Sequence, residues 1–473
     1  MQVRNPRTGA FDYSIAPLDA GAIRREASRL RAAQPAWAAL PMGERMAALA
    51  ALADAIEAER EGIAAALTLD TGRRRISRVE VAAVAGSLRR WASMAPDIVA
   101  RLVDPPRPSV IPGIETAGRL EPYALVGAIS PWNFPLILTM IDVAPALAAG
   151  CAAIVKPSEI TPRFIAPLRA ALARVPVLEG VFAIVEGDGA TGAALVEAVD
   201  YIAFTGSVAT GRKVAEAAAR ALIPASLELG GKDPMIVAPS ADPARAAAIA
   251  LRASIANSGQ ACQSIERVYA VGTAAEPFLA ELVTQARAVR LNHPDIGSGD
   301  IGPFIDARQA GIVAAQIADA VAGGAVIHSG GAVETLDGGL YLRPTVLTGV
   351  TPGMAIMTEE TFGPVIPVVF TDSVEEAIRQ ANDTRFGLSA SVLAGSVEEG
   401  EAIARQLRAG AVSINDAGLT AMIWEREKSA FGHSGLGPSR MGDSALSRFF
   451  RRQAIFRQHG TAQLLNSIAE DGG

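Results

Sequence analysis

The sequence predicts an α/β fold with parallel sheets, divided into more than one domain. From Tyr123 onward, short apolar runs alternate with helical stretches, and a second alternation of the same kind follows Gly231. Strands that are apolar on both faces and separated by helices form parallel sheets with crossover connections. The chain has 473 residues, of which 50% are hydrophobic, enough for roughly two to four domains.

The first hundred residues predict helices. Residues 20–40, 43–69 and 77–102 each place apolar side chains three and four positions apart, with arginine and glutamate between them. The proline-rich run 104–112 ends this pattern and opens an irregular or hairpin-like stretch to about Pro122.

The two alternating regions then predict strands and helices in turn. In the first region we expect strands at 125–130, 151–155, 182–185 and 201–204, with helices at 191–199 and 211–222. In the second we expect strands at 235–237, 268–271, 325–327, 365–370 and 388–393, with helices at 242–253, 275–289 and 374–381. A last apolar strand is expected at 448–458.

Composition excludes several classes of protein. The net charge of -6 gives no electrostatic footprint for nucleic acid. The run 134–155 approaches membrane-spanning length, but Pro145 and Gly150 predict a buried helix followed by a buried strand, and no membrane partner. Two cysteines fit a reducing cytosol, and the N-terminus has no apolar signal core, so we expect a cytoplasmic protein.

The two cysteines differ in their surroundings. Cys262 lies among small and polar residues in the run Asn-Ser-Gly-Gln-Ala-Cys-Gln, which suggests a reactive thiolate. Cys151 lies at the start of an apolar strand, where a cysteine acts as a small hydrophobic residue.

Several polar residues follow predicted strands, where ligands of parallel sheets bind. The run 204–211, with Gly206 and Ser207, follows a strand and opens a helix; it is either a phosphate-binding loop or an ordinary strand–helix turn. Lys156 and Glu159 end another strand and either meet ribose hydroxyls or form a solvated pair.

Asn133 and Glu228 are candidates for catalytic work. Asn133 lies between two prolines, so its amide is well placed to stabilise an oxyanion, unless the segment is only a rigid turn. Glu228 lies in an apolar strand before two glycines. If unpaired there, its pKa is expected to be raised and it can act as a base; otherwise it faces solvent.

Glu360 and Phe362 could hold a sugar hydroxyl and a flat ring, or could belong to a plain loop. The four histidines are not paired at metal-ligand spacing and no Cys-x-x-Cys is present, so we expect no metal.

These motifs, in this order, resemble the aldehyde dehydrogenase superfamily in its hydrolytic, NAD(P)-dependent branch. The resemblance runs from Asn5 to about Phe450, with Glu228 34 residues before Cys262 and Glu360 98 residues after it. It implies oxidation of an aldehyde to a carboxylic acid through a thiohemiacetal and a thioester on Cys262.

The resemblance also implies roles for single residues. Cys262 matches the nucleophile, Asn133 the oxyanion donor and Glu228 the base that activates water. The expected cofactor contacts are Trp132, Lys156, Ser158, Glu159, Gly206, Ser207, Glu360 and Phe362.

Glu228 favours hydrolysis over transfer to coenzyme A, and Glu159 favours NAD, although NADP stays possible. Two alternatives remain: a coenzyme A-acylating enzyme, and a catalytically silent binding protein of the same fold.

The implied fold has a Rossmann-like NAD-binding domain, a second α/β catalytic domain and a small β oligomerisation element. We assign 1–103 and 123–230 to the first, 231–430 to the second, and 104–122 with 448–473 to the third; 431–447 returns to the cofactor domain. The family implies a homodimer or homotetramer. The strand element would pair with a partner's sheet.

The substrate is the least defined point. Leu138 and Ile141 follow Asn133 by about a helical turn and are expected to line the substrate tunnel. By analogy with the family, residues 418–426 form its mouth. Met422 and Trp424 in that loop suggest an apolar or aromatic aldehyde, whereas Arg426 could meet a carboxylate or stay solvated. His433 and Asp142 depart from the family pattern and leave cofactor and substrate detail open.

Overall fold

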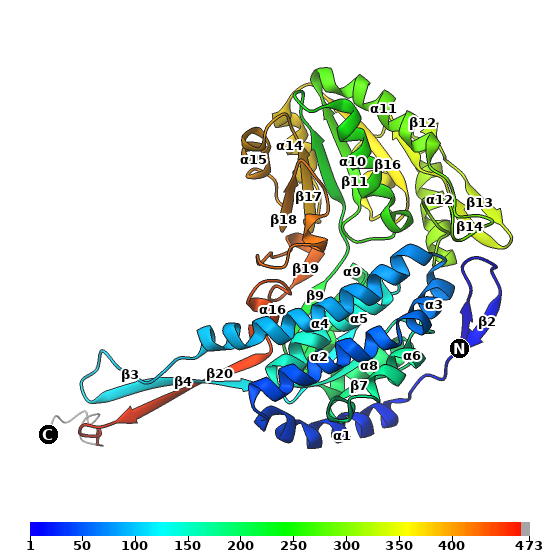
Figure 1. The fold of residues 1–473 in the computed structure, drawn as a ribbon. Coiled ribbons are helices and arrows are strands. Elements are labelled where there is room, and N and C mark those ends of the chain that lie inside the picture. The colour runs from blue at the N-terminus through cyan, green and yellow to red at the C-terminus, as the bar shows by residue number, and fades with distance from the viewer. Residues whose placement is uncertain (465–473) are drawn as a thin grey trace.

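The computed structural model describes residues 1–464, and its architecture is mixed α/β with parallel sheets, as the sequence predicts. Figure 1 shows two lobes, one from each half of the chain, and a strand arm that extends away from them. The predicted strand element ends in residues 465–473, which lie outside the described part of the chain.

The first lobe is built on a sheet with the strand order β19-β9-β8-β5-β6-β7. All neighbours are parallel except β19, which runs antiparallel to β9. Its strands are β5 (Leu125–Ile129), β6 (Ala152–Lys156), β7 (Phe182–Ile184), β8 (Tyr201–Thr205), β9 (Ala225–Glu228) and β19 (Gly435–Leu436). Residue 435 thus joins a sheet whose other strands end at residue 228.

Helices surround this sheet and form one buried apolar core with it. They are α1 (Ala20–Ala39), α2 (Met42–Ala58), α3 (Arg60–Thr71), α4 (Arg74–Leu102), α5 (Pro135–Ala149), α6 (Ile165–Leu172), α7 (Pro176–Glu179), α8 (Gly189–Ala198), α9 (Val208–Ala221) and α16 (Ser444–Ser447). The expected single helix over 43–69 is wrong, because α2 and α3 are separated at Glu59, which leaves helical geometry at φ -93° and ψ 8°.

Helix α5 is the segment of near membrane-spanning length. Pro135 begins it at a position where the missing N–H costs nothing, and Gly150 ends it in the left-handed conformation. Only Gly150 and Cys151 separate α5 from β6, so the predicted buried helix and strand are confirmed. In residues 1–464, no helix is both long and apolar enough to cross a membrane.

The second lobe is built on a sheet with the order β12-β15-β16-β11-β10-β17-β18. Only the edge strand β12 is antiparallel to its neighbour. The strands are β10 (Asp233–Val237), β11 (Ile265–Val271), β12 (Val326–Ser329), β15 (Thr345–Thr348), β16 (Val365–Thr371), β17 (Ser389–Leu393) and β18 (Ala411–Ile414). The helices are α10 (Pro243–Ile255), α11 (Ala275–Ala288), α12 (Ala307–Ala322), α13 (Ala355–Thr358), α14 (Val374–Asn382) and α15 (Val397–Ala404).

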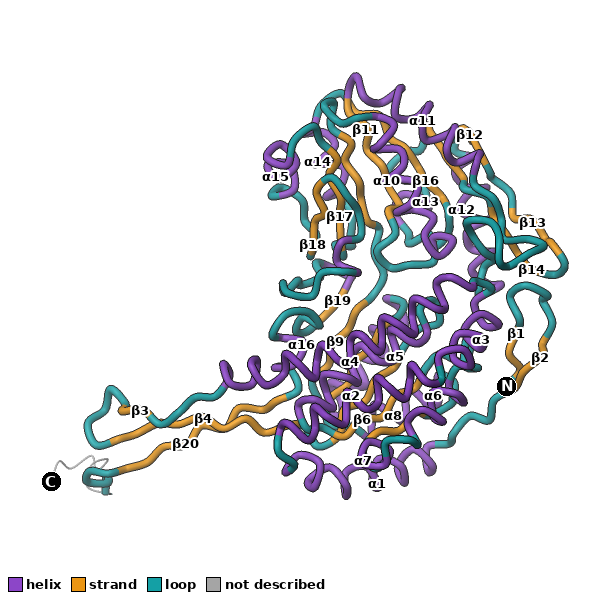
Figure 2. The backbone as a smooth tube through the Cα atoms, in the orientation of Figure 1, coloured by secondary structure: helices purple, strands orange, loops and turns teal. Residues whose placement is uncertain are grey.

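The arm is a separate antiparallel sheet of β3 (Arg107–Pro108), β4 (Ile114–Pro122) and β20 (Phe450–Gln458). Figure 2 shows these strands running out from the body, with the C-terminal end of the described chain at their tip.

Two small hairpins complete the fold: β1 (Gln2–Arg4) with β2 (Phe11–Ser14), and β13 (Val333–Leu336) with β14 (Gly339–Leu342). Arg7 donates to the carbonyl of Asn292, so the N-terminal hairpin segment contacts the second lobe.

Candidate active site

A cleft of about 1150 Å³ collects residues from both lobes. The predicted site residues that line it are Trp132, Asn133, Leu138, Lys156, Ser158, Glu159, Gly206, Ser207, Glu228, Cys262, Glu360 and Phe362. They come from segments that follow β5, β6 and β8, from the end of β9, and from two loops of the second lobe. The fold therefore brings these distant motifs to one place.

Cys262 follows a strained turn, the 3₁₀ segment Ala256–Gly259. Asn257 and Ser258 both have φ of 56°, in the left-handed region that such residues seldom adopt. Gly259 continues this conformation at φ 71°, and a Cβ there would lie 2.2 Å from the backbone of Gly363. The loop thus passes against the Gly363 segment at a distance that only glycine allows.

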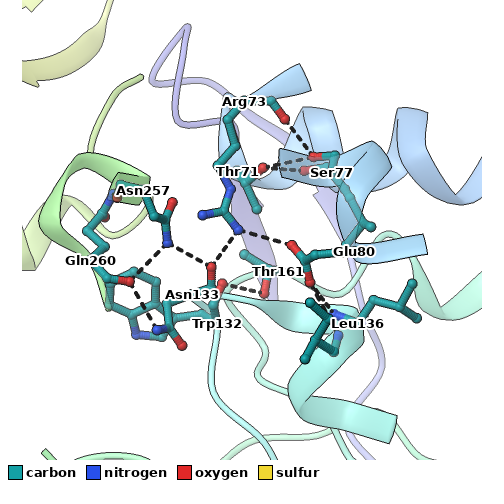
Figure 3. A network of polar contacts seen from close by, with 12 residues as sticks. Thr71, Arg73, Ser77, Glu80, Trp132, Asn133, Leu136, Thr161, Asn257 and Gln260 are labelled. Carbon is teal, nitrogen blue, oxygen red and sulfur yellow. Dashed lines mark hydrogen bonds and ion pairs between the residues drawn. The ribbon is translucent and has the colours of Figure 1, made fainter. Parts of the chain in front are cut away.

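A buried hydrogen-bond network holds this loop against Asn133 (Figure 3). The side-chain amide of Asn257 donates to the backbone carbonyl of Asn133 at 3.0 Å and to that of Gln260 at 2.9 Å. Gln260 in turn donates to the carbonyl of Asn257 and accepts from the N–H of Ile305. Strain in the turn is thus held in place by the surrounding bonds.

The Asn133 side chain has a fixed orientation. It is 3% exposed, and its Nδ2 donates to the carbonyl of Gln260 at 3.0 Å. This bond shows which end of the amide is the NH₂ group. An NH₂ group has a second hydrogen, and for it no further partner is recorded within residues 1–464. The arrangement suits a donor aimed at a developing negative charge.

Arg73 and Glu80 fix the backbone of the segment that carries Asn133, and neither residue was predicted from the sequence. The Arg73 guanidinium donates to the Asn133 carbonyl at 2.5 Å and pairs with Glu80 at 3.1 Å. Glu80 also accepts from the N–H groups of Leu136 and Ile137, at the start of α5. The only sequence signal was a carboxylate placed among the apolar positions of a helix.

Burial of the thiol raises the pKa of Cys262 to about 12 from 9.0. Nearby Glu228 and Glu360 add to this rise, and Lys428 opposes it. A pKa raised in this way favours the neutral thiol in the resting site, so the reactive thiolate would be its minor form. Cys151, in contrast, is fully buried, and burial raises the pKa of its thiol. In the described part of the chain, the one hydrogen bond recorded for its Sγ goes to the Phe449 carbonyl.

Glu228 is not the unpaired carboxylate that the sequence suggested. Its Oε2 lies 3.7 Å from the ammonium of Lys428, and the two side chains are 19% and 7% exposed. Lys428 is separated from Glu228 by 200 residues, so no local pattern could have identified the pair.

The Glu360–Phe362 turn is fixed by a second buried ion pair. Glu266 accepts from the N–H groups of Thr361 and Phe362, both at 2.8 Å, and pairs with Lys232 at 2.8 Å. Burial raises the pKa of Glu360. Phe362 meets Trp132 edge to face, with ring centroids 5.4 Å apart, across the cleft.

The other end of the cleft lies at the carboxyl ends of β6 and β8. The Lys156 ammonium is buried and donates to the carbonyl of Gly187 at 2.9 Å and to Glu159 at 3.2 Å. Ser207 caps α9 by accepting from the N–H of Thr210. Within residues 1–464 no hydrogen bond is recorded from the N–H of Val208 or Ala209, and amides at a helix start suit an anion. This donor set fits a dinucleotide, with an acidic group for a ribose and a helix start for a pyrophosphate.

The predicted substrate residues divide into two groups. Leu138 lines the cleft, whereas Ile141, Met422 and Trp424 are not among its lining residues. Met422 is 65% exposed. The Trp424 ring stacks on the Arg90 guanidinium at 4.2 Å.

The two departures from the family pattern have definite surroundings. His433 lines the cleft and lies 3.3 Å from a guanidinium nitrogen of Arg212. Asp142 is buried and pairs with Arg440 at 3.0 Å and with Arg448 at 2.6 Å. Within residues 1–464, no cluster of three potential ligands is arranged to hold a metal ion.

Comparison with known proteins matches the family model described as "Aldehyde dehydrogenase family" to residues 1–455. A Mycolicibacterium smegmatis protein named "Putative succinate-semialdehyde dehydrogenase" with NADP(+) is 39% identical over 93% of this chain and 84% of its own. A solved structure of a "Putative Aldehyde Dehydrogenase" from Anabaena variabilis is 50% identical, with a TM-score of 0.95, over 98% of this chain and 99% of its own. Betaine aldehyde dehydrogenase from Staphylococcus aureus, solved with NAD+, is 28% identical with a TM-score of 0.92, over 99% of this chain and 94% of its own.

Proposed function

The chain belongs to the aldehyde dehydrogenase family and oxidises aldehydes to carboxylic acids with NAD(P)+, and on this premise we propose that Cys262, Asn133 and Glu228 carry the chemistry. The observation that supports this assignment is their position in one cleft, although they come from three separate segments.

The reaction divides between the three residues. The Cys262 thiol loses its proton to water in the cleft as its sulfur attacks the aldehyde carbon, and the oxygen that becomes negative is held by the Asn133 amide and the N–H of Cys262. The C–H bond of this tetrahedral carbon then breaks and the hydrogen leaves as hydride, for which bound NAD(P)+ would be the acceptor. The acyl group remains on sulfur as a thioester. Glu228 takes a proton from water, the hydroxide attacks the thioester carbon, and the C–S bond breaks to release the acid and Cys262.

The polar groups that line the cleft support binding of the cofactor there. Lys156, Ser158 and Glu159 would hold the adenosine ribose, and Gly206 and Ser207 the pyrophosphate. Glu360 and Phe362, together with Trp132, would hold the nicotinamide ribose and its ring. Because a carboxylate repels a 2′-phosphate, Glu159 favours NAD. Glu159→Gln should raise kcat/KM for NADP relative to NAD, and an unchanged ratio would contradict this preference.

Two variants, together with a control at the second cysteine, test the assignment. Cys262→Ala should form no NADH with any aldehyde, and Cys151→Ala, which alters the buried cysteine, should keep activity. Glu228→Gln should still give one rapid turnover of NADH but release acid slowly. Full activity in Cys262→Ala would refute the assignment. A product bound to coenzyme A, instead of free acid, would favour the acylating alternative. Cofactor binding without turnover would favour a silent binding protein.

For the substrate we propose an apolar or aromatic aldehyde, supported by Leu138 in the cleft. A carboxylate-bearing aldehyde is the second candidate. Two observations support it. The Arg90 guanidinium, a cation that could meet a carboxylate, stacks on Trp424, and Trp424 belongs to the loop expected at the tunnel mouth. The mycobacterial relative is also named for a semialdehyde that bears a carboxylate. The test compares the rates of wild type and Arg90→Met with a phenyl-substituted aldehyde and with a semialdehyde. This comparison separates the two candidate substrate classes.

We also propose that the arm formed by β3, β4 and β20 joins subunits into a homodimer or homotetramer. Two exposed apolar residues support this role: Ile111, in the turn between β3 and β4, is 57% exposed, and Phe456 on β20 is 72% exposed. Light scattering of the wild type and of Phe456→Glu would test it, since a smaller assembly is expected for the variant.

The proposed domain limits, with 431–447 in the cofactor domain, are supported by the pairing of β19 with β9. The free cysteines support a cytoplasmic location.

A further inference from the structure

Lys428 reaches the site from a segment to which the family resemblance assigned no role. The segment precedes β19, whose Gly435 pairs with Glu228 on β9. The Lys428 N–H donates to Ser439 Oγ at 3.2 Å, and this oxygen also accepts from the N–H of Met441 at 3.2 Å. The backbone of Lys428 is therefore anchored beside the strand that carries Glu228.

Glu228 lies between two cavities. It lines the main cleft together with Cys262. It also lines a second cavity of about 180 Å³, whose other walls include Lys428, Ser439 and Arg448. A polar cavity of this size has room for several water molecules. Lys428 lines this second cavity and is not among the residues that line the main cleft.

The charges around Cys262 are mostly acidic. Glu228, Glu360 and Asp233 each disfavour its thiolate, while Lys428 is the cation recorded as favouring it. Lys232 lies nearby but is paired with Glu266. Within residues 1–464, Lys428 is therefore the cation placed to offset negative charge in the reacting centre.

We propose that Lys428 is a positioning residue that acts through both reacting groups. Its ammonium holds the Glu228 carboxylate at the rim of the cleft, and its positive potential stabilises the Cys262 thiolate during attack. The inference rests on the proposed function, since it needs Cys262 as nucleophile and Glu228 as base.

A purely structural ion pair accounts less well for this arrangement. Burying a lysine is costly, and apolar side chains of similar volume commonly replace buried pairs without loss of stability. At 3.7 Å the Lys428–Glu228 contact is also longer than a direct charge-assisted hydrogen bond. The position therefore suits electrostatic action on a carboxylate that must also reach water.

An activated ester tests this role without cofactor, because 4-nitrophenyl acetate acylates a thiolate and releases 4-nitrophenolate. In Lys428→Gln, the burst of 4-nitrophenolate should be about tenfold slower near neutral pH, and its pH profile should move up by about one unit, which is a tenfold change in thiolate at fixed pH. Lys428→Arg should restore both, because the charge is kept. Lys428→Met serves as a second neutral variant, and thermal unfolding confirms that each variant is folded.

Arg405→Met is the matched control, because Arg405 also pairs with a glutamate but lies on the exposed helix α15 end. Its burst and pH profile should equal those of the wild type. A profile of Lys428→Gln that superimposes on the wild type would overturn the inference, as would equal slowing in Lys428→Gln and Lys428→Arg without a shift in pH. Retained aldehyde oxidation in Cys262→Ala would instead refute the proposed function.

Discussion

Asn133→Ala should lower the rate of acylation far more than it lowers the free energy of unfolding. The side chain makes one recorded hydrogen bond in the described chain, from Nδ2 to the Gln260 carbonyl. That carbonyl keeps a second donor, the amide of Asn257 at 2.9 Å. The backbone carbonyl of Asn133 also keeps its bonds from Arg73 and Asn257. Truncation therefore leaves no buried backbone oxygen unpaired.

Two magnitudes follow from this geometry. Loss of one hydrogen bond that leaves no orphan partner costs about 0.5–1.5 kcal/mol of folding free energy. Loss of an oxyanion donor costs about 2.7–4 kcal/mol of transition-state stabilisation, or roughly 10²–10³ in rate. The rate of acylation should therefore fall far more than stability.

The assay is the rapid NADH burst on mixing enzyme and NAD with an aldehyde, together with urea unfolding of the same preparations. Asn382→Ala is a control outside the cleft, where the amide donates to the Gln406 carbonyl at 2.9 Å and accepts from the N–H of Arg408 at 2.8 Å. It should lower stability at least as much as Asn133→Ala and leave the acylation rate unchanged. An acylation rate within about threefold of wild type would refute the reasoning, because donor loss should cost roughly a hundredfold or more. A loss of folding free energy that matches the loss in rate would refute it too.

Three further predictions concern separate parts of the site. In Glu228→Gln the first turnover of NADH should persist while steady-state turnover falls by about 10²–10⁴; absence of the first turnover would show that Glu228 is needed before deacylation. Alkylation of Cys262 by iodoacetamide should rise about tenfold per pH unit from about pH 7 to pH 9, because the reactive thiolate is the minor form below a pKa of about 12; a plateau in that range would contradict the buried thiol. Arg73→Met should cost about 3–5 kcal/mol in urea unfolding, because it leaves the Glu80 carboxylate buried without its cation; a cost under about 1 kcal/mol would contradict the importance of this pair.

The sequence predicted the fold class because strand and helix patterns are local. β5, β6 and β8 lie within about one residue of their predicted limits. The break at Glu59 was missed, because alanine-rich helical periodicity continues on both sides and no proline or glycine marks it. A helix end that is set by tertiary packing carries no such signal in the sequence.

The site was predictable as far as its members carry recognisable motifs. Cys262, Asn133 and Glu228 each stand in a distinctive run, and the structure places all three in one cleft. Lys428 and Arg73 stand in no such run, and their partners are 200 and 60 residues away in the chain. Which cation meets which carboxylate is decided by tertiary packing, and residue spacing does not encode it.

The pairing of β4 with β20 has a consequence for biosynthesis. Ile114–Pro122 must wait for Phe450–Gln458 before its ladder can form, and β19 reaches Glu228 only after residue 435 has been made. Contacts of such long sequence separation form late during vectorial synthesis. A nascent chain that stalls before residue 428 therefore carries Cys262, Asn133 and Glu228 without β20, without β19 and without the lysine beside its base. Completion of the reacting centre is thus tied to completion of translation.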